Sequence, residues 1–184
     1  MGLPMVVGGA ALVVYGFAKN QNPNIENDVM QAIEDTLVGR QKTLAQIINN
    51  YAPFIQSASS AYGVPWQYIV GIIWQESRGK PKAYRYEPKL GEASYGLMQT
   101  LESTARSVGF TGQAENLYDP STSINYGTKY LSVLYSKYGN WDDTVMSYNA
   151  GHPGTSAGQT YLVSVSDTVS DLNDMIQQGE VTYG

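Results

Sequence analysis

Apolar residues recur every three or four positions along most of the chain, a spacing that places them on one side of a helix. Two such stripes follow each other between Thr43 and Gly63, and two long ones follow after Asp119. Their members are Leu44, Ile47, Ile48 and Tyr51; Phe54, Ile55, Ala58, Ala61 and Tyr62; Ile124, Gly127, Leu131, Leu134 and Tyr138; and Leu162, Val165, Val169, Leu172 and Ile176. The pattern predicts a mainly helical domain.

Turn and capping residues mark where the predicted helices begin and end. A short amphipathic helix is expected over 26–38, where apolar residues are spaced by four positions and Gly39 follows as a stop. Pro65 suits the first position of another helix. Asp119 before a proline is typical of a helix cap, and Asp142 opens a shorter helix.

The helical pattern lapses between residues 83 and 95. Tyr84 and Tyr86 alternate there with charged residues, and Gly91 supplies a turn. This arrangement predicts a small hairpin or an irregular lobe. The expected fold class is therefore mainly α, within an α+β domain.

The first 18 residues carry no charged side chain, and Lys19 follows them. As a helix they would span about 27 Å, just short of a typical hydrocarbon core. No positively charged region precedes them, which argues against a signal peptide. We expect an apolar helix that anchors the chain in a membrane or packs into a larger assembly, and a tail packed on its own domain is the alternative. The NQNPN sequence at 20–24 predicts a linker.

Composition narrows the classes of protein that fit. The 184 residues are 42% hydrophobic and 15% charged, with no Cys and one His, which excludes a disulfide-stapled miniprotein and disfavours a structural zinc site or a disordered chain. A net charge of -5 argues against a protein that grips nucleic acid phosphates. The chain has 15 Tyr and 3 Phe, so most of its aromatic surface carries a hydroxyl that suits a polar, ring-shaped ligand.

Basic residues concentrate in one short segment, from Arg78 to Lys89. No basic residue follows Lys137, so the last part of the chain is acidic. Two interpretations of the basic segment are open: a solvated charged loop, or a rim that faces an anionic polymer.

Glu76 is a carboxylate on the apolar side of the helix that Pro65 begins. It follows Ile69 by seven residues and Ile72 by four, which places it on the buried stripe. It also lies in the last turn, where the negative end of the helix dipole opposes ionisation. Burial and dipole both raise a carboxyl pKa, as a general acid at neutral pH requires. The alternative is a side chain that reaches solvent or pairs with Arg78 or a nearby lysine.

A general acid that protonates a glycosidic oxygen usually has a second carboxylate opposite it. Glu87 and Glu92 flank the non-helical lobe, and Asp119 is expected to cap a helix. The sequence does not single out one of them.

Four short motifs occur in order downstream of Pro65. They are Glu76-Ser77, Gly96-Leu97-Met98-Gln99, Ser147-Tyr148-Asn149-Ala150-Gly151 and Thr160-Tyr161-Leu162. Together they resemble the soluble lytic transglycosylase (SLT) family, relatives of goose-type lysozyme. The resemblance runs from Asn49 to Val165 and implies a lysozyme-like fold and an enzyme that needs neither metal nor cofactor.

The resemblance also implies roles for individual residues. Glu76 matches the single catalytic acid and base, which protonates the bond between N-acetylmuramic acid and N-acetylglucosamine. The same Glu then takes a proton from the muramic C6 hydroxyl, whose attack forms a 1,6-anhydro product without a second carboxylate. Ser77 matches a position whose hydroxyl bonds substrate or steadies the acid.

Five more residues match the substrate-binding part of that family. Met98 offers an apolar contact to sugar and Gln99 reaches polar groups. The Tyr148 phenol orients the carboxyl or stabilises positive charge, and Asn149 bonds the N-acetyl group. Tyr161 matches a cleft-lining tyrosine. Met98 and Tyr161 also fit simple core packing, because apolar stripes continue from both.

The predicted organisation is an apolar anchor or assembly segment at 1–18, a linker and amphipathic helix at 19–48, the SLT domain at 49–165 and a helical tail at 166–184. The expected partners are peptidoglycan strands, with membrane or virion proteins contacting 1–18 and no nucleic acid. We expect a virion component delivered to the cell envelope for local wall opening during phage genome entry; a periplasm-facing protein anchored in the inner membrane is the alternative. A hydrolysing muramidase and a non-catalytic wall-binding component remain alternatives to the transglycosylase.

Overall fold

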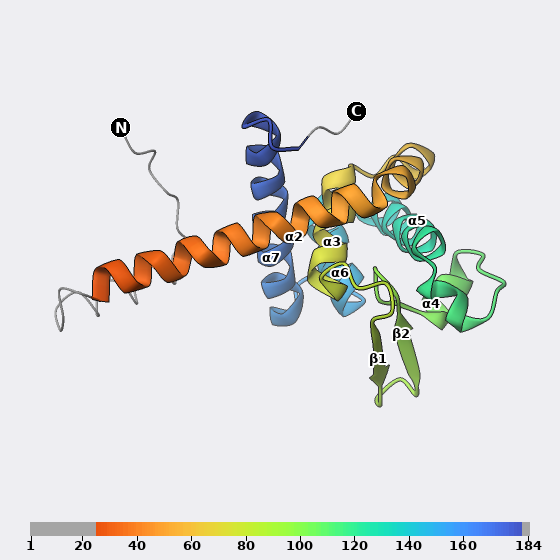
Figure 1. Cartoon of the computed structure of the whole chain (residues 1–184). Helices are drawn as coiled ribbons and strands as arrows, with labels where there is room; N and C mark the ends of the chain where they lie inside the picture. The colour runs from red at the N-terminus through yellow and green to blue at the C-terminus, as the bar shows by residue number, and fades with distance from the viewer. Residues whose placement is uncertain (1–24, 182–184) are drawn as a thin grey trace. The chain divides into compact units, whose positions relative to one another are not determined.

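The computed structural model describes residues 25–181, so the apolar segment and the linker predicted before Ile25 lie outside the described residues. The chain divides between Lys42 and Thr43 into two compact units, which are described separately. The elements are α2 (Ile25–Tyr62), α3 (Trp66–Ser77), β1 (Tyr84–Glu87), β2 (Glu92–Tyr95), β3 (Thr100–Leu101), α4 (Glu102–Ser107), the 3-10 helix η1 (Ala114–Tyr118), α5 (Pro120–Tyr138), α6 (Trp141–Ala150) and α7 (Ser156–Gln177). Figure 1 shows these elements in order.

The described part of the first unit is helical throughout, because α2 begins at Ile25 and continues past residue 42. The helix end expected at Gly39 is therefore wrong. Glycine costs a helix interior about 1 kcal/mol relative to alanine without forbidding it, and no side chain or backbone atom lies within 4 Å of the Cβ position at Gly39. The same helix also passes Pro53, which lacks one N–H donor. The predicted domain boundaries at 18, 48 and 165 stay a prediction.

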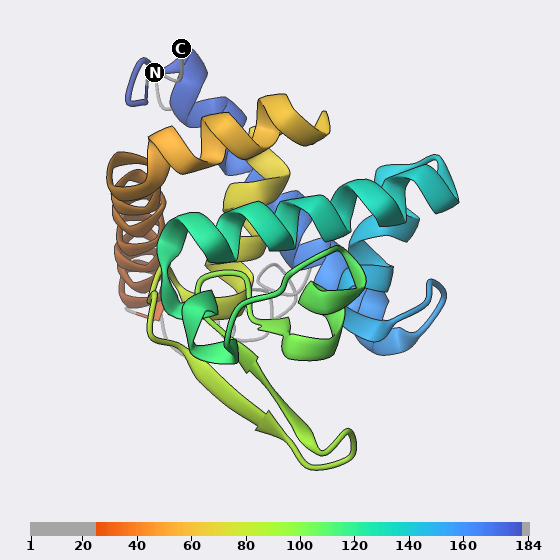
Figure 2. The ribbon, with the colours of Figure 1, turned by 90° about the vertical axis from the view of Figure 1, so that its right-hand side faces the viewer.

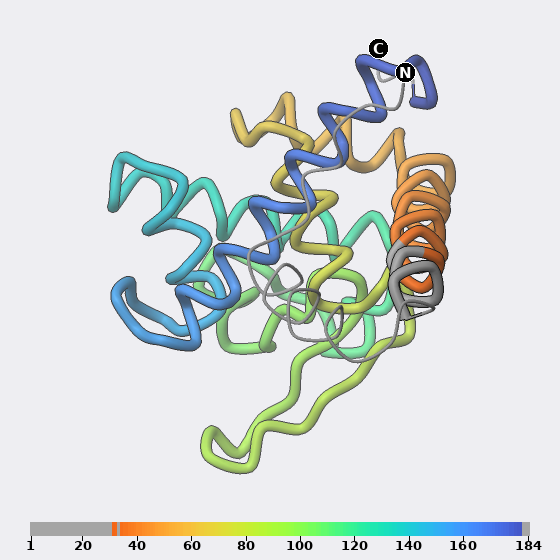
Figure 3. Tube along the Cα trace, turned by 90° about the vertical axis from the view of Figure 1, so that its left-hand side faces the viewer, coloured from red at the N-terminus to blue at the C-terminus, as the bar shows by residue number. Residues whose placement is uncertain are grey.

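Helix α3 forms the centre of the second unit. Its residues 69–73 are buried consecutively, so the helix is covered on nearly every side. Helix α7 packs along it, and α6 packs against both α5 and α7 (Figures 2 and 3). All four predicted apolar stripes contribute residues to this core, including Leu44, Ile55 and Leu131, each fully buried.

Capping side chains set the starts of the later helices. Asp119 Oδ1 accepts from the Thr122 backbone N–H at 2.9 Å, which confirms the predicted cap of α5. Asn140 caps α6 in the same way, so this helix begins one residue before the expected Asp142. Each cap satisfies a backbone donor that a helix start otherwise leaves unpaired.

The predicted hairpin is confirmed as strands β1 and β2, which extend from the helical body in Figure 2. They pair antiparallel, with Arg85 opposite Ser94, and the short strand β3 adds to β2 with Leu101 opposite Ser94. Strand β3 and helices α4 and η1 were not predicted, because each is too short to establish a periodic pattern. The mainly α class with a small β lobe is confirmed.

Helices between residues 25 and 181 include none that combines the length and the apolar character needed to cross a membrane.

Candidate active site

A pocket of about 180 Å³ opens at the carboxyl end of α3, against the β lobe and the end of α6. Residues from five elements (α3, β1, β2, β3 and α6) line it, which brings together parts of the sequence that are far apart. The lining residues are Glu76, Arg85, Glu87, Leu90, Ser94, Gln99, Leu101, Tyr148 and Asn149.

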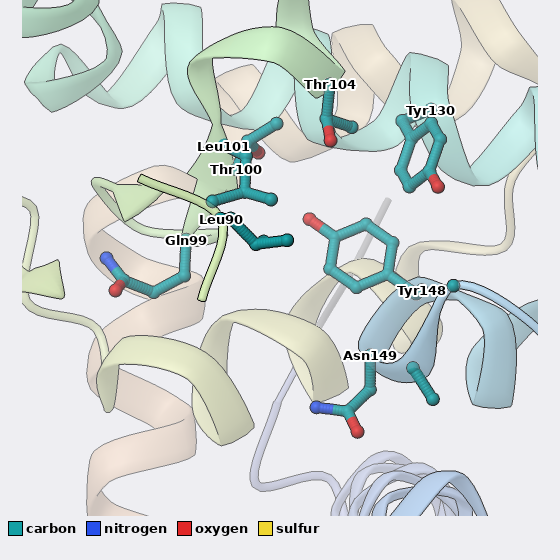
Figure 4. Close-up of a pocket in the computed structure, with 10 residues that line it drawn as sticks. Leu90, Gln99, Thr100, Leu101, Thr104, Tyr130, Tyr148 and Asn149 are labelled. Atoms are coloured by element: carbon teal, nitrogen blue, oxygen red, sulfur yellow. The ribbon is translucent and has the colours of Figure 1, made fainter. Parts of the chain in front are cut away.

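A second pocket of about 320 Å³ continues the first (Figure 4). The two share Leu90, Gln99, Leu101, Tyr148 and Asn149, and the second adds residues of α4, α5 and the end of α6. The Tyr130 ring lies beside the Tyr148 ring, with 5.7 Å between their centroids. Because they share these five residues, the two pockets form one continuous groove.

Glu76 projects into the first pocket from the last turn of α3. The Tyr161 hydroxyl on α7 donates a hydrogen bond of 2.6 Å to Glu76 Oε1. Burial raises the pKa of the Glu76 carboxyl above its ordinary value, the Tyr161 hydrogen bond and the Arg85 charge oppose that rise, and the Glu87 charge adds to it. The Tyr161 hydrogen bond thus orients the carboxyl, and its pKa lies above the ordinary value of a glutamate.

The expected alternative for Glu76, a pairing with Arg78, does not describe this site. Arg78 ends α3 in the left-handed conformation, at a φ of 54°, and its guanidinium lies 3.9 Å from the centre of the Trp74 ring. This stacking directs the positive charge onto an aromatic face. Glu76 takes its hydrogen bond from a neutral phenol instead.

Tyr148 lines both pockets, and its hydroxyl donates to the Met98 carbonyl at 2.8 Å. Burial, followed by the nearby Glu76 charge, raises the pKa of the phenol well above its usual range. The same two effects raise the pKa of Tyr161. Both phenols therefore remain neutral hydrogen-bond donors next to the carboxyl, and the one that bonds the carboxyl is Tyr161.

Two of the expected site residues lie beneath the groove. Ser77 is buried, and its hydroxyl lies 2.8 Å from the Leu97 carbonyl and 3.1 Å from the Ile73 carbonyl. Met98 is fully buried because its side chain fills the space that Gly127 leaves open, where an added Cβ would lie 2.6 Å from the Met98 sulfur. Ser77 joins the end of α3 to the groove wall, and Met98 joins that wall to α5.

Gln99 is part of the wall itself and has a positive φ of 45°. Its side-chain amide donates to the carbonyls of Ala83 and Gly96 at 3.0 Å, and its carbonyl accepts from the Ser94 hydroxyl at 3.0 Å. Gly96 begins this segment at a φ of 75°, where a Cβ would lie 2.0 Å from the Leu117 carbonyl oxygen. Only glycine fits at that position.

The structure therefore sorts the expected site residues into two layers. Glu76, Gln99, Tyr148 and Asn149 line the groove, and Asn149 is exposed within it. Ser77, Met98 and Tyr161 form the layer beneath and hold the first set in place. Of the hairpin side chains that line the pocket, Leu90 was missed from the sequence, and Arg85 and Glu87 were expected only as part of the basic segment and as one of three candidate carboxylates. The alternation of tyrosines and charges in β1 was the available signal, since residues two apart share a strand face.

The structure also separates the three candidates for a second carboxylate. Glu87 lies in the pocket with Glu76. Glu92 binds the backbone N–H and the hydroxyl of Ser103, and Asp119 caps α5. Among the residues that the structure describes, no three His, Cys, Asp or Glu side chains gather as a metal site would require.

Comparisons with known proteins agree with this geometry. Residues 53–161 match the family model for the transglycosylase SLT domain. The membrane-bound lytic murein transglycosylase E of Buchnera aphidicola is 31% identical over 155 residues, which cover 78% of this chain and 68% of that protein. The transglycosylase of Enterobacteria phage PRD1 is 31% identical over 97 residues, covering 53% of this chain and 33% of that protein.

Longer proteins match over part of their length. The membrane-bound lytic murein transglycosylase C of Yersinia enterocolitica is 32% identical over 145 residues, and the match covers 69% of this chain and 38% of that protein. This chain thus spans about a third of the length of the PRD1 and Yersinia proteins.

Solved structures share the fold. The 70 kDa soluble lytic transglycosylase of Escherichia coli superposes with a TM-score of 0.60 at 25% identity, over 68% of this chain and 24% of that one. An inactive mutant of the lytic transglycosylase Slt from Pseudomonas aeruginosa also gives a TM-score of 0.60, over the same shares and at 21% identity. With the family model matched across the whole groove, the chain belongs to the transglycosylase SLT domain family.

Proposed function

We propose that the chain cleaves peptidoglycan as a lytic transglycosylase, breaking the β-1,4 bond from N-acetylmuramic acid to N-acetylglucosamine. The observation that carries the proposal is the Glu76 carboxyl, whose pKa burial raises and which Tyr161 orients at one end of a groove. The membrane-bound and phage relatives are named transglycosylases, which supports the same activity.

The reaction follows from the two oxygens of Glu76. Tyr161 donates to Oε1, so Oε2 carries the acid proton. Glu76 gives this proton to the glycosidic oxygen as the bond from that oxygen to muramic C1 breaks. The muramic C6 hydroxyl then bonds to C1 and returns its proton to the Glu76 carboxylate. The products are a 1,6-anhydro end and a free N-acetylglucosamine C4 hydroxyl, and no water is consumed.

The other side chains of the groove bind the sugar units. Asn149 lies exposed beside Tyr148, where its amide is available to the N-acetyl group. The Tyr130 and Tyr148 rings supply aromatic surface in the second pocket, against which a pyranose ring packs. Gln99, Ser77 and Met98 support these contacts from within the wall.

The test is digestion of purified peptidoglycan by the wild type and by Glu76→Gln, with mass analysis of the released fragments. We expect 1,6-anhydro ends from the wild type and a loss of activity of about a hundredfold or more in the variant. Glu180→Gln, at an exposed position, is the matched control. Equal wall clearance by Glu76→Gln and wild type would instead favour the non-catalytic wall-binding role.

A hydrolysing muramidase is the second candidate, and Glu87 is the observation that favours it. A carboxylate in the same pocket as the acid is the arrangement in which a water attacks C1 while the carboxylate accepts its proton. Reducing ends in place of anhydro ends would establish this reaction. If Glu87→Gln then removed the reducing ends, Glu87 would be the base.

We further propose that the protein acts at the bacterial envelope as a phage virion component, with residues 1–18 contacting a membrane or other virion proteins. The similarity to the PRD1 transglycosylase supports this setting. The membrane-bound relatives support the alternative of a protein anchored in the inner membrane. Detection of the chain in purified particles, or in the inner-membrane fraction of cells that lack particles, distinguishes the two.

A further inference from the structure

The structure separates the basic residues between Arg78 and Lys89 by their surroundings. The Arg78 guanidinium stacks on Trp74, and Lys82 Nζ lies 5.1 Å from the centre of the Tyr118 ring. Arg85 is the basic residue that lines the pocket containing Glu76. Among the described residues of this segment, Arg85 is therefore the one whose positive charge lies in the pocket with Glu76.

Arg85 is held in position from both its backbone and its side chain. Its backbone pairs with Ser94 across the hairpin, and its Nε donates to Glu87 Oε1 on the same face of β1. The Arg85 side chain keeps 63% of its surface exposed, against 29% for Glu87. The hydrogen bond to Glu87 uses Nε, which leaves the two terminal amino groups as a pair of donors for another acceptor.

A planar pair of N–H donors binds a carboxylate more strongly and more selectively than a neutral polar group. The rest of the pocket offers neutral donors and acceptors from Ser94, Gln99 and Asn149, together with two acidic side chains. In this pocket an incoming carboxylate would be repelled by the Glu87 carboxylate and attracted by the Arg85 guanidinium. Such a ligand must therefore reach the pocket on the Arg85 side.

We propose that Arg85 binds a carboxylate of the glycan strand and so selects substrates that carry one beside the bond to be cleaved. The inference rests on the proposed function. Two sources supply this chemistry in peptidoglycan: the lactyl group of a muramic residue that carries no peptide, and the acidic residues of a stem peptide. Arg85 is then a specificity-determining residue, and Glu87 is the residue that positions it.

The experiment compares three substrates: peptidoglycan with its stem peptides, glycan strands stripped of peptides by an amidase, and stripped strands whose lactyl carboxyls are reduced to alcohols. Relative to its effect on the reduced strands, Arg85→Gln is expected to lower kcat/KM about tenfold on at least one of the first two, mainly through KM. A loss confined to stem-bearing strands assigns the stem carboxylates, and a loss confined to stripped strands assigns the lactyl group.

Two further variants separate carboxylate recognition by Arg85 from its effect on the pKa of Glu76. Arg85 also lowers the pKa of Glu76, so its removal shifts the pH dependence on every substrate. We therefore compare the ratio of kcat/KM between substrates at each pH. The shift in pH dependence is common to all substrates and cancels in this ratio. Arg85→Lys keeps the charge and is expected to recover part of the selectivity. Lys89→Gln, on the same hairpin and outside both pockets, is the matched control.

Equal losses by Arg85→Gln on all three substrates would overturn the inference, because Arg85 would then act only through Glu76. Wild-type protein that cleaves none of the three would instead overturn the proposed function. The two failures are thus distinguishable in one set of assays.

Discussion

The Tyr161 hydroxyl donates a 2.6 Å hydrogen bond to Oε1 of Glu76, across 85 residues of sequence. This bond joins the last turn of α3 to the start of α7 and is the direct protein contact on the carboxyl that the structure provides. It stabilises the ionised form, while burial stabilises the protonated form. The pKa of Glu76 is set mainly by the balance of these two effects, and the Arg85 and Glu87 charges make smaller contributions of opposite sign.

Tyr161→Phe removes the hydrogen bond that stabilises the ionised form of Glu76. Without the hydrogen bond, the pKa of Glu76 rises further, so the alkaline limb of kcat/KM against pH moves to higher pH. The maximum of kcat/KM falls about tenfold, because the carboxyl loses its orientation. Tyr148→Phe is the comparison: its hydroxyl bonds the Met98 carbonyl, so the limb is expected to stay in place. The opposite outcome would assign the orienting role to Tyr148.

Glu76→Gln is expected to stabilise the folded protein above neutral pH. The folded state holds the proton of Glu76 more tightly than the unfolded chain, so the free energy of unfolding of the wild type falls as pH rises from the unfolded pKa through the folded one. The amide avoids this loss, so the variant is expected to have the higher Tm at pH 8. The difference disappears below about pH 4, where the glutamate is protonated in both states. Thermal unfolding at both pH values checks this, and equal midpoints at pH 8 would contradict it.

Gly127→Ala tests how closely the groove wall packs on α5. The added Cβ would lie 2.6 Å from the Met98 sulfur and 2.8 Å from Met98 Cβ, so the wall segment must move. We expect a loss of about 1–3 kcal/mol in the free energy of unfolding, together with lower activity, measured by denaturant titration and fragment release. Gly39→Ala, a helical position with open space around it, is the control and should not destabilise the protein.

Ser77→Ala separates a structural hydroxyl from one that binds substrate. The buried hydroxyl is within hydrogen-bond distance of the Leu97 carbonyl, so its removal leaves that acceptor unpaired and costs about 1–3 kcal/mol of unfolding free energy. KM should change little, because Ser77 does not line the groove. A rise in KM at unchanged stability would show that the hydroxyl contacts the sugar.

The parts of the fold that follow from periodic patterns were predictable. The stripe of isoleucines before Glu76 placed a carboxyl at the end of a buried helix, and α3 ends at Ser77 as the following Arg78-Gly79 sequence requires. The alternation around Tyr84 and Tyr86 predicted the hairpin. These signals are local, because each depends on residues within one element.

The division of roles between Tyr148 and Tyr161 was not predictable in the same way. It depends on how α6 and α7 pack against α3, which no spacing within either helix encodes. The resemblance gave Tyr148 two alternative roles, orienting the carboxyl or stabilising positive charge, and in the structure the hydrogen bond to the carboxyl comes from Tyr161. The helix end predicted at Gly39 was wrong for a related reason. Glycine lowers helix stability, but the residues on either side of Gly39 continue the helix.

The fixed side chain of Gln99 affects how a substrate is captured. Its amide group is tied to Ala83, Gly96 and Ser94, so the rotational freedom of this long side chain is already lost in the folded protein. A ligand entering the groove therefore meets a wall that needs no ordering, and the entropy penalty of association is smaller by that amount. Each encounter with a correctly oriented strand can then proceed without waiting for this wall to rearrange.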